Sequence, residues 1–133
     1  MTIALVLTGC GDATKEKVHP VKGQLFYKGM PTPGAVIWLH RIEPKDAPAQ
    51  KKLQTPPRGV VQGDGTFEIS TYATNDGAPA GTYRVSVRWT KVKGGDEEEN
   101  LLPVRYLDPG TSGLPVVEIK AEPNVLAKID LIP

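Results

Sequence analysis

Apolar and polar residues alternate most regularly from residue 83 to residue 90, where every second side chain is apolar. The apolar positions there are Tyr83, Val85, Val87 and Trp89. A second alternating stretch spans residues 66–72 and places Phe67, Ile69 and Thr71 on one side. A period of two predicts β-strands with one buried and one solvent-facing side. Turns at residues 63–65 and 75–81 flank the 66–72 stretch, so we expect these two strands at the centre of the fold.

Weaker patterns of the same kind predict five more strands. They span residues 18–28, 35–42, 59–62, 114–121 and 125–131. Their expected inward residues are Val21, Gly23, Leu25, Tyr27, Val117, Ile119, Ala127, Ile129 and Leu131. The 59–62 strand is expected to form a hairpin with the 66–72 strand across the Gly-rich turn.

The 35–42 strand has apolar residues on both faces. One face holds Ala35, Ile37 and Leu39, and the other holds Val36, Trp38 and His40. The pattern therefore leaves the inward face open, and a strand covered on both sides is one explanation.

The remaining segments are expected to connect strands. Residues 29–34, 109–113 and 122–124 have the Gly, Pro and Asn content of turns. The Pro-rich stretch 43–58 predicts a surface loop that is long enough to be mobile or to bind a partner. Residues 91–100 predict a charged, flexible hairpin tip, and residues 101–108 a semi-extended segment. No helical period is present, so about seven short strands predict an all-β sandwich of two sheets.

Composition narrows the classes of protein that this chain fits. Its 133 residues suffice for one domain, and 14 Gly and 13 Pro suit short strands joined by turns. The formal net charge is +1 and the basic residues are scattered. We therefore expect no nucleic-acid partner.

The chain has a single cysteine, Cys10, which follows an apolar run and the small residues Thr8 and Gly9. This arrangement resembles a bacterial lipobox, in which the cysteine thiol is acylated and becomes the new N-terminus. It predicts a signal-peptide remnant at 1–9, a lipid-anchored tether at 10–17 and a domain at 18–133. Residues 1–9 contain no Lys or Arg, so either the true start lies upstream or the likeness is accidental. The alternative is an N-terminal strand with an unmodified, buried Cys10.

The ordered set of motifs resembles a known family. The motifs are PVKG at 20–23, G-x-P-x-x-G-A at 29–35, D-G-x-F at 64–67, DGAPAGTY at 76–83, LPVRY at 102–106, TSGL at 111–114 and Asn124. Together they are similar to carboxypeptidase regulatory-like domains, which have the transthyretin (prealbumin-like) sandwich fold, and most of all to small planctomycete lipoproteins. The resemblance covers nearly the whole chain. It implies a non-enzymatic module attached to the cell envelope, on its periplasmic or outer-surface side.

Residues with catalytic or metal-binding chemistry are few. His19 and His40 allow at most a weak surface metal site, since zinc takes three or four ligands. The acidic run at residues 96–99 lacks the alternate spacing of a calcium loop. Ser70, Ser86 and Ser112 lie in strand or turn patterns without a G-x-S-x-G elbow. We therefore predict no catalytic residue, metal or cofactor. A cleft that gathered His19, His40 and Arg105 would favour an enzyme instead.

The aromatic residues leave one alternative function open. If some of Phe26, Trp38, Tyr72 and Tyr106 face outward, they offer stacking surfaces for sugar rings, whereas the simpler interpretation is cross-strand packing. An exposed coplanar pair would favour a carbohydrate-binding module, and burial of Trp38 and Trp89 would count against it. The main prediction is a lipid-anchored structural or protein-interaction module. Its expected partners are the membrane, through the lipid, and an envelope protein or polysaccharide.

Overall fold

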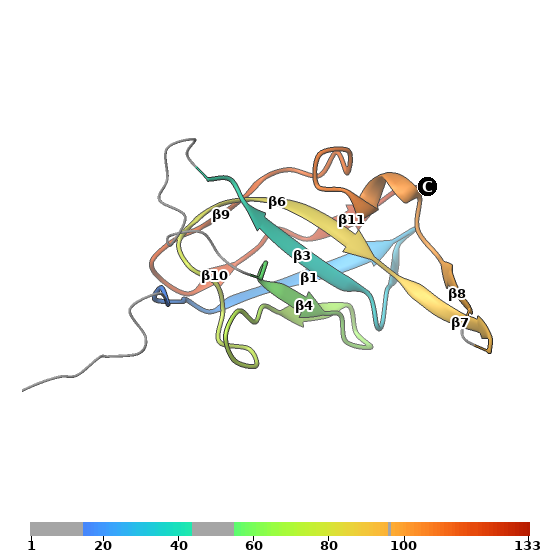
Figure 1. The fold of residues 1–133 in the computed structure, drawn as a ribbon, viewed down its shortest axis with the longest axis horizontal. Coiled ribbons are helices and arrows are strands. Elements are labelled where there is room, and N and C mark those ends of the chain that lie inside the picture. The colour runs from blue at the N-terminus through green and yellow to red at the C-terminus, as the bar shows by residue number, and fades with distance from the viewer. Residues whose placement is uncertain (1–14, 44–54, 96) are drawn as a thin grey trace, which may run out of the picture.

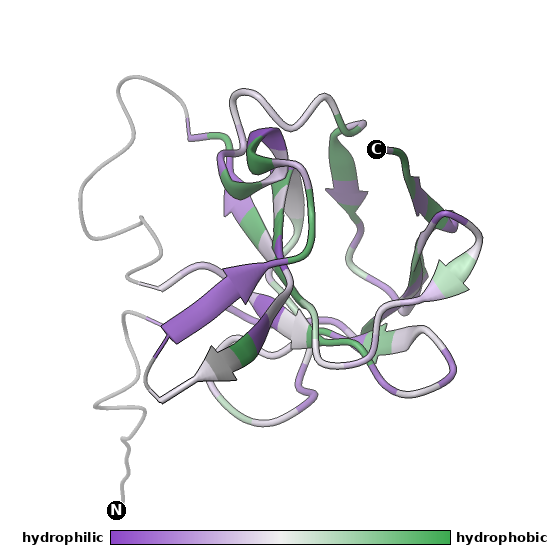
Figure 2. Ribbon diagram, turned by 90° about the vertical axis from the view of Figure 1, so that its right-hand side faces the viewer, coloured by the Kyte–Doolittle hydropathy of each residue, from purple (hydrophilic) through white to green (hydrophobic). Residues whose placement is uncertain are grey.

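The computed structural model describes residues 15–43, 55–95 and 97–133, which form two β-sheets packed face to face (Figure 1). Both sheets contribute to one apolar core, so the prediction of an all-β sandwich is confirmed. Figure 2 shows hydrophobic and hydrophilic residues alternating along strands of both sheets, as a half-buried strand requires.

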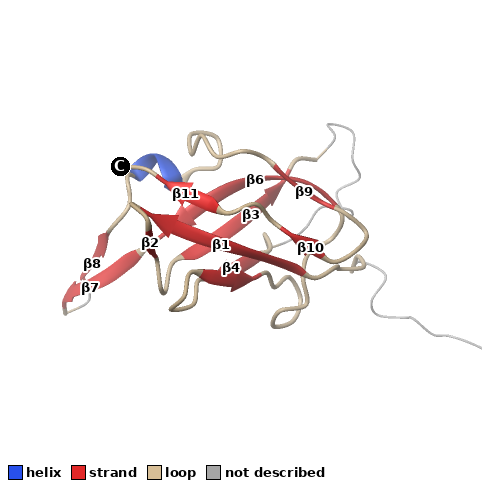
Figure 3. Cartoon of the chain, turned by 180° about the vertical axis from the view of Figure 1, so that it is seen from behind, coloured by secondary structure: helices blue, strands red, loops and turns tan. Residues whose placement is uncertain are grey.

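The first sheet is built around β1 (Val21–Tyr27), as the view from behind shows (Figure 3). Two short strands run parallel to one side of β1, namely β10 (Asn124–Val125) and β11 (Ile129–Leu131). Two others run antiparallel to it, namely β2 (Met30–Pro31) and β5 (Thr66–Glu68).

The second sheet has the order β4-β3-β6-β9, and all its pairs are antiparallel. Its strands are β4 (Arg58–Val60), β3 (Val36–Arg41), β6 (Gly81–Arg88) and β9 (Val117–Ile119). Beyond β6 the chain forms a hairpin of β7 (Thr90–Gly94) and β8 (Glu97–Asn100), then the 3-10 helix η2 (Val104–Leu107). The described residues contain no helix with the length and hydropathy of a membrane span.

Most of the predicted inward residues lie in the core. Those that are almost completely buried are Val21, Leu25, Phe67, Ile69, Tyr83, Val85, Val87, Ile119 and Leu131. Tyr27, Val117 and Ile129 are half-buried against this core, and Ala127 is exposed. Gly23 lies opposite Phe67, whose ring occupies the space that a side chain at Gly23 would need.

The inward face of β3, which the sequence left open, carries Ala35, Ile37 and Leu39, all fully buried. The alternate residues Trp38 and His40 point to the outer face of the second sheet and are half-buried there.

The predicted strand at 66–72 is too long, because β5 ends at Glu68. The Asp76 carboxylate accepts hydrogen bonds from the backbone N–H groups of Thr71, Tyr72 and Ala73 at 2.7–3.0 Å. An Asp that binds nearby backbone donors competes with the ladder and favours a turn.

Four further segments differ from prediction. The turn predicted at 29–34 is narrower, since Lys28 and Gly29 both have positive φ and form the bend before β2. The segment 101–108 contains η2, and 125–131 is split into β10 and β11. The 59–62 strand belongs to the second sheet, and its hairpin with 66–72 joins the two sheets through an Arg58–Ser70 bridge. Residues 44–54 of the predicted long loop lie outside the described part of the chain.

Gly77→Ala should destabilise the fold by about 2 kcal/mol or more and lower Tm by roughly 5–10 °C. Gly77 has a φ of +101°, and a Cβ there would overlap the carbonyl of His19. Gly63→Ala is the matched control, because a Cβ at Gly63 meets open space, and it should change stability by less than about 0.5 kcal/mol. Thermal unfolding followed by circular dichroism measures both. Equal Tm values for the two variants would refute this account of the turn.

Candidate functional site

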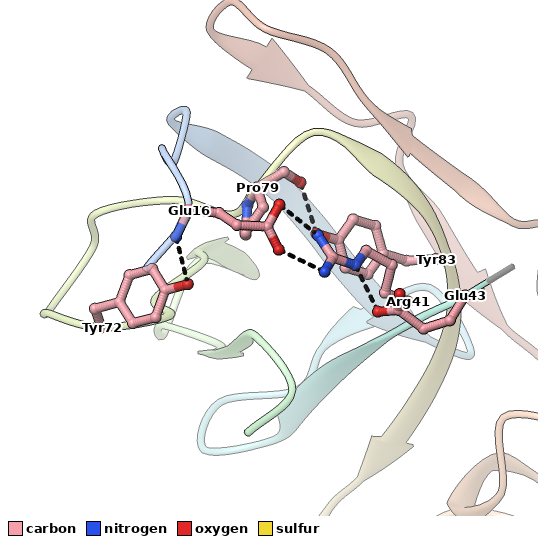
Figure 4. A network of polar contacts seen from close by, with 6 residues as sticks. All are labelled: Glu16, Arg41, Glu43, Tyr72, Pro79 and Tyr83. Atoms are coloured by element: carbon pink, nitrogen blue, oxygen red, sulfur yellow. Dashed lines mark hydrogen bonds and ion pairs between the residues drawn. The ribbon is translucent and has the colours of Figure 1, made fainter. Parts of the chain in front are cut away.

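A cluster of polar contacts, which we call the polar clamp, joins the segment before β1 to the end of β3 (Figure 4). The clamp consists of Glu16, Arg41, Glu43 and Tyr72. The Arg41 guanidinium donates to both oxygens of the Glu16 carboxylate, at 3.0 and 2.5 Å. Its Nε donates to Glu43 at 2.8 Å. The Tyr72 hydroxyl accepts from the Glu16 backbone N–H at 3.0 Å, and the Lys15 ammonium lies over the Tyr72 ring. The described part of the predicted tether is thus bound to the domain.

The clamp exists because Arg41 continues the inward series of β3. Its side chain is only 10% exposed, and a guanidinium in such a position needs carboxylate partners to offset its lost hydration. Hydrogen bonds to Glu16, opposed by burial, raise the pKa of Arg41 above its ordinary value, so the charge persists at any physiological pH.

Tyr83 lies beside Arg41 in the β3–β6 ladder and is fully buried. Its hydroxyl donates to the Pro79 carbonyl at 2.6 Å, which satisfies the polar end of the buried ring. Burial raises the pKa of Tyr83 to about 12. Figure 4 shows Tyr83 next to Arg41 of the clamp, with Pro79 nearby.

The outer face of the second sheet carries a groove of about 540 Å³, which we call the Trp38 groove. Its lining residues come from β3, β6, the β7–β8 hairpin and η2, and they are Trp38, His40, Ser86, Val87, Arg88, Thr90, Glu98, Asn100 and Leu107. Trp38 is paired with Ser86 across the ladder, so their side chains project on the same face.

A neutral pair forms part of the lining of this groove. His40 Nε2 and Ser86 Oγ are 2.7 Å apart. Burial lowers the pKa of His40, and this outweighs the opposite effect of Asp108, so the imidazole is uncharged at neutral pH. A Ser–His contact resembles part of a nucleophilic dyad, but Ser86 is 3% exposed, which keeps its hydroxyl away from a substrate carbonyl.

The structure separates the residues that would have formed an enzyme site. His19 pairs through its backbone with Ala78. His40 lies on the outer face of β3, and Arg105 of η2 donates to the carbonyls of Ile132 and Pro133. Each residue therefore contacts a different element.

The other candidate groups have structural partners. Ser70 and Ser112 accept hydrogen bonds from the backbone N–H groups of Asn75 and Leu114. Glu98 and Glu99 form ion pairs with Arg88 and Lys91. Among the described residues, no three His, Cys, Asp or Glu side chains are grouped to hold a metal.

The predicted aromatic residues are spread over different elements. Tyr106 is buried, Tyr72 is 40% exposed, and Phe26, Trp38 and Trp89 are half-buried. A basic side chain lies over Phe26, Trp38 and Tyr72: Lys128, Arg58 and Lys15, respectively. The half-burial of Trp38 and Trp89 leaves the sugar-binding alternative open, with Trp38 as the aromatic residue of the groove.

The sequence predictions did not identify Glu16, Arg41, Arg88, Asn100 or Leu107 as site residues. The sequence pattern could have indicated only the groove, because Trp38 and His40 lie on the face opposite to the apolar series of β3. The Glu16–Arg41 pair joins residues 25 positions apart, and no local pattern encodes it.

No protein-family model and no curated protein matches this chain. Among solved structures, it is similar to a DUF3823 family protein from Bacteroides ovatus, with 12% identity and a TM-score of 0.43 over 85% of this chain. It spans 44% of that protein. It is also similar to a “putative carbohydrate binding protein” from Pseudomonas aeruginosa, with 11% identity, a TM-score of 0.43 and 90% of each chain covered. Likenesses of this size carry no argument about ligand, activity or lipoprotein family.

Glu16→Gln should lower the free energy of unfolding by about 1–2 kcal/mol, because the nearly buried Arg41 loses a carboxylate that accepts two of its hydrogen bonds. Asp130→Asn is the matched control. The Lys128–Asp130 pair is 3.7 Å long and both side chains are about half exposed, so its loss should cost less than about 0.5 kcal/mol. Urea unfolding of both variants measures the difference. A Glu16→Gln effect no larger than that of Asp130→Asn would show that the clamp contributes nothing.

His40 should make stability fall as the pH drops below its ordinary pKa of 6.5. Since burial lowers its pKa in the folded state, the unfolded state binds more protons between the two pKa values. The contribution is complete above pH 6.5 and is lost as the pH falls toward the folded pKa. His40→Gln should reduce the drop in Tm between pH 7.5 and 5.5. Parallel Tm profiles for wild type and His40→Gln would contradict this assignment.

Proposed function

We propose that this chain is a non-catalytic cell-envelope module, anchored by a lipid on Cys10, that binds a partner through the Trp38 groove. The observation that carries the proposal is the clamp. It fixes Glu16 to the domain six residues after Cys10, and six residues span at most about 20 Å. An anchor at Cys10 would therefore hold the clamped end of the sandwich close to the membrane.

The position of the groove fits such an anchor. The first described residues lie at one end of the sandwich and the β7–β8 hairpin at the other (Figure 1). The Trp38 groove includes Thr90, Glu98 and Asn100 of that hairpin, so it opens toward the end farther from the clamp. A short, docked connection then presents the groove away from the bilayer, where an envelope protein or polysaccharide can reach it.

The side-chain chemistry supports binding over catalysis. The groove combines an aromatic wall with a few amide, hydroxyl and charged groups, a composition typical of ligand sites. Ser86 is almost fully buried and hydrogen-bonded to His40, and Arg105 of η2 donates to the backbone carbonyls of Ile132 and Pro133.

Mass spectrometry of the protein purified from its native membranes tests the anchor. We expect a chain that begins at Cys10 and has the added mass of a diacyl or triacyl group. Cys10→Ser is the control, and it should move the protein from the detergent-rich to the aqueous phase in a detergent partition experiment, because the acyl methylenes that hold it are lost. An unacylated chain that keeps residues 1–9 would overturn the anchored module.

A further inference from the structure

We infer that the Trp38 groove binds one uncharged sugar unit of a polysaccharide. This inference rests on the proposed function in one respect, since it takes the groove as the binding surface. It does not depend on the lipid anchor.

The shape of the groove follows from the strand register. Trp38 and His40 of β3 lie beside Ser86 and Arg84 of β6 on the outer face. The edge strand β9 pairs with Gly81–Tyr83 at the start of β6, and η2 packs against β6 as well. Leu107 of η2, 41% exposed, completes the lining together with the base of the β7–β8 hairpin. A volume of about 540 Å³ lies within the range of small-molecule sites, roughly 300–1,000 Å³.

The groove offers an aromatic face to its ligand. The Arg58 guanidinium lies 5.8 Å from the centre of the Trp38 ring, and Arg58 belongs to β4, on the opposite side of β3 from β6. The other side of the indole therefore faces β6 and the groove. The negative face of an aromatic ring attracts C–H groups, and a pyranose ring presents a row of them on its apolar face. Leu107 adds a second apolar surface in the same groove.

The polar lining suits hydroxyl groups, which both donate and accept hydrogen bonds. Asn100 Oδ1 accepts from the Leu102 N–H at 3.3 Å, which orients the amide, and its Nδ2 has no partner among the described residues. Glu98 accepts from Thr90 Oγ1 at 3.0 Å and from Arg88 at 3.5 Å. A carboxylate has about four acceptor positions and a guanidinium five donors, so this pair keeps capacity for two neighbouring hydroxyls.

The charges in the groove favour an uncharged ligand. The positive charge of Arg88 is matched by Glu98 within the same groove. His40 lies next to Arg84 in the ladder and within the field of Asp108, and its imidazole is neutral. Because Arg88 and Glu98 are paired within the lining, neither an anionic nor a cationic ligand meets an unpaired Arg or Glu there, whereas a sugar gains from stacking and hydrogen bonds.

Binding is tested by titrating the ¹⁵N-labelled chain with neutral oligosaccharides (gluco-, manno- and xylo-oligomers), with polygalacturonate fragments and with an extended peptide. We expect a neutral oligosaccharide to bind and to shift the Asn100 side-chain amide signal. Trp38→Ala should weaken its binding at least about tenfold and Asn100→Ala about fivefold. Trp38→Phe keeps an aromatic face and should retain part of the affinity, so it separates lost stacking from a misfolded chain.

Two residues of η2 provide a matched pair of variants. Leu107→Ala should weaken binding about threefold, whereas Val104→Ala should leave it within about twofold, because Val104 is 74% exposed and does not line the groove. The inference is overturned if no neutral oligosaccharide binds, if the acidic fragments or the peptide bind more tightly, or if folded Trp38→Ala binds as well as wild type. None of these results bears on the acylation of Cys10, so the two proposals fail separately.

Discussion

The antiparallel pairing of β3 with β6 is the constraint on which the rest of this structure depends. Six residue pairs join the two strands, from Val36–Arg88 to Arg41–Tyr83. Because side chains alternate between the faces of a strand, this one register sends Ile37, Leu39, Val85 and Val87 into the core and Trp38, Ser86 and Arg88 to the outside. The same ladder therefore builds the core and the groove.

The end of that ladder also explains the clamp. Arg41 is the last residue of the inward series, so its charge lies where the core meets solvent. Glu16 and Glu43 supply the anionic partners, and recruiting Glu16 draws the N-terminal segment onto the domain. Tyr83, opposite Arg41, fills the space below with a ring whose hydroxyl is already bound to Pro79. The strand alternation places the charged Arg41 on the inward face of β3, and its need for carboxylate partners connects the N-terminal segment to the sandwich.

The alternation of apolar and polar residues made the core predictable. It failed to predict where a strand ends when a side-chain hydrogen bond to the backbone determines that end. The alternation at Tyr83, Val85 and Val87 is strong because every second residue must be buried. The end of β5 depends instead on Asp76, which lies eight residues after Glu68. The Asp76 carboxylate accepts hydrogen bonds from three backbone N–H groups at residues 71–73, beyond the end of β5.

Other features depend on contacts that no local pattern reports. The helix η2 is four residues long, too short for a 3.6-residue period, and Pro103 at its start gave only a hint of it. In the groove, Trp38 and His40 could be identified from the sequence, because they lie on the face of β3 opposite to the apolar series that forms the core. Asn100 and Leu107 could not, because tertiary packing alone brings the hairpin and η2 to β6.

The clamp and the Trp38 groove use side chains from opposite faces of β3, and this affects how substitutions in them change stability. Arg41 and Tyr83 point inward at the clamped end, whereas Trp38 and Ser86 point outward nearer the middle. His40 of the groove and Arg41 of the clamp are neighbours in β3, so substitutions at these two positions can have coupled effects on stability. A slip of one residue in the β3–β6 register would bury Trp38 and expose Leu39, which would abolish the core and the groove together. The packing of the core therefore enforces the geometry of the groove.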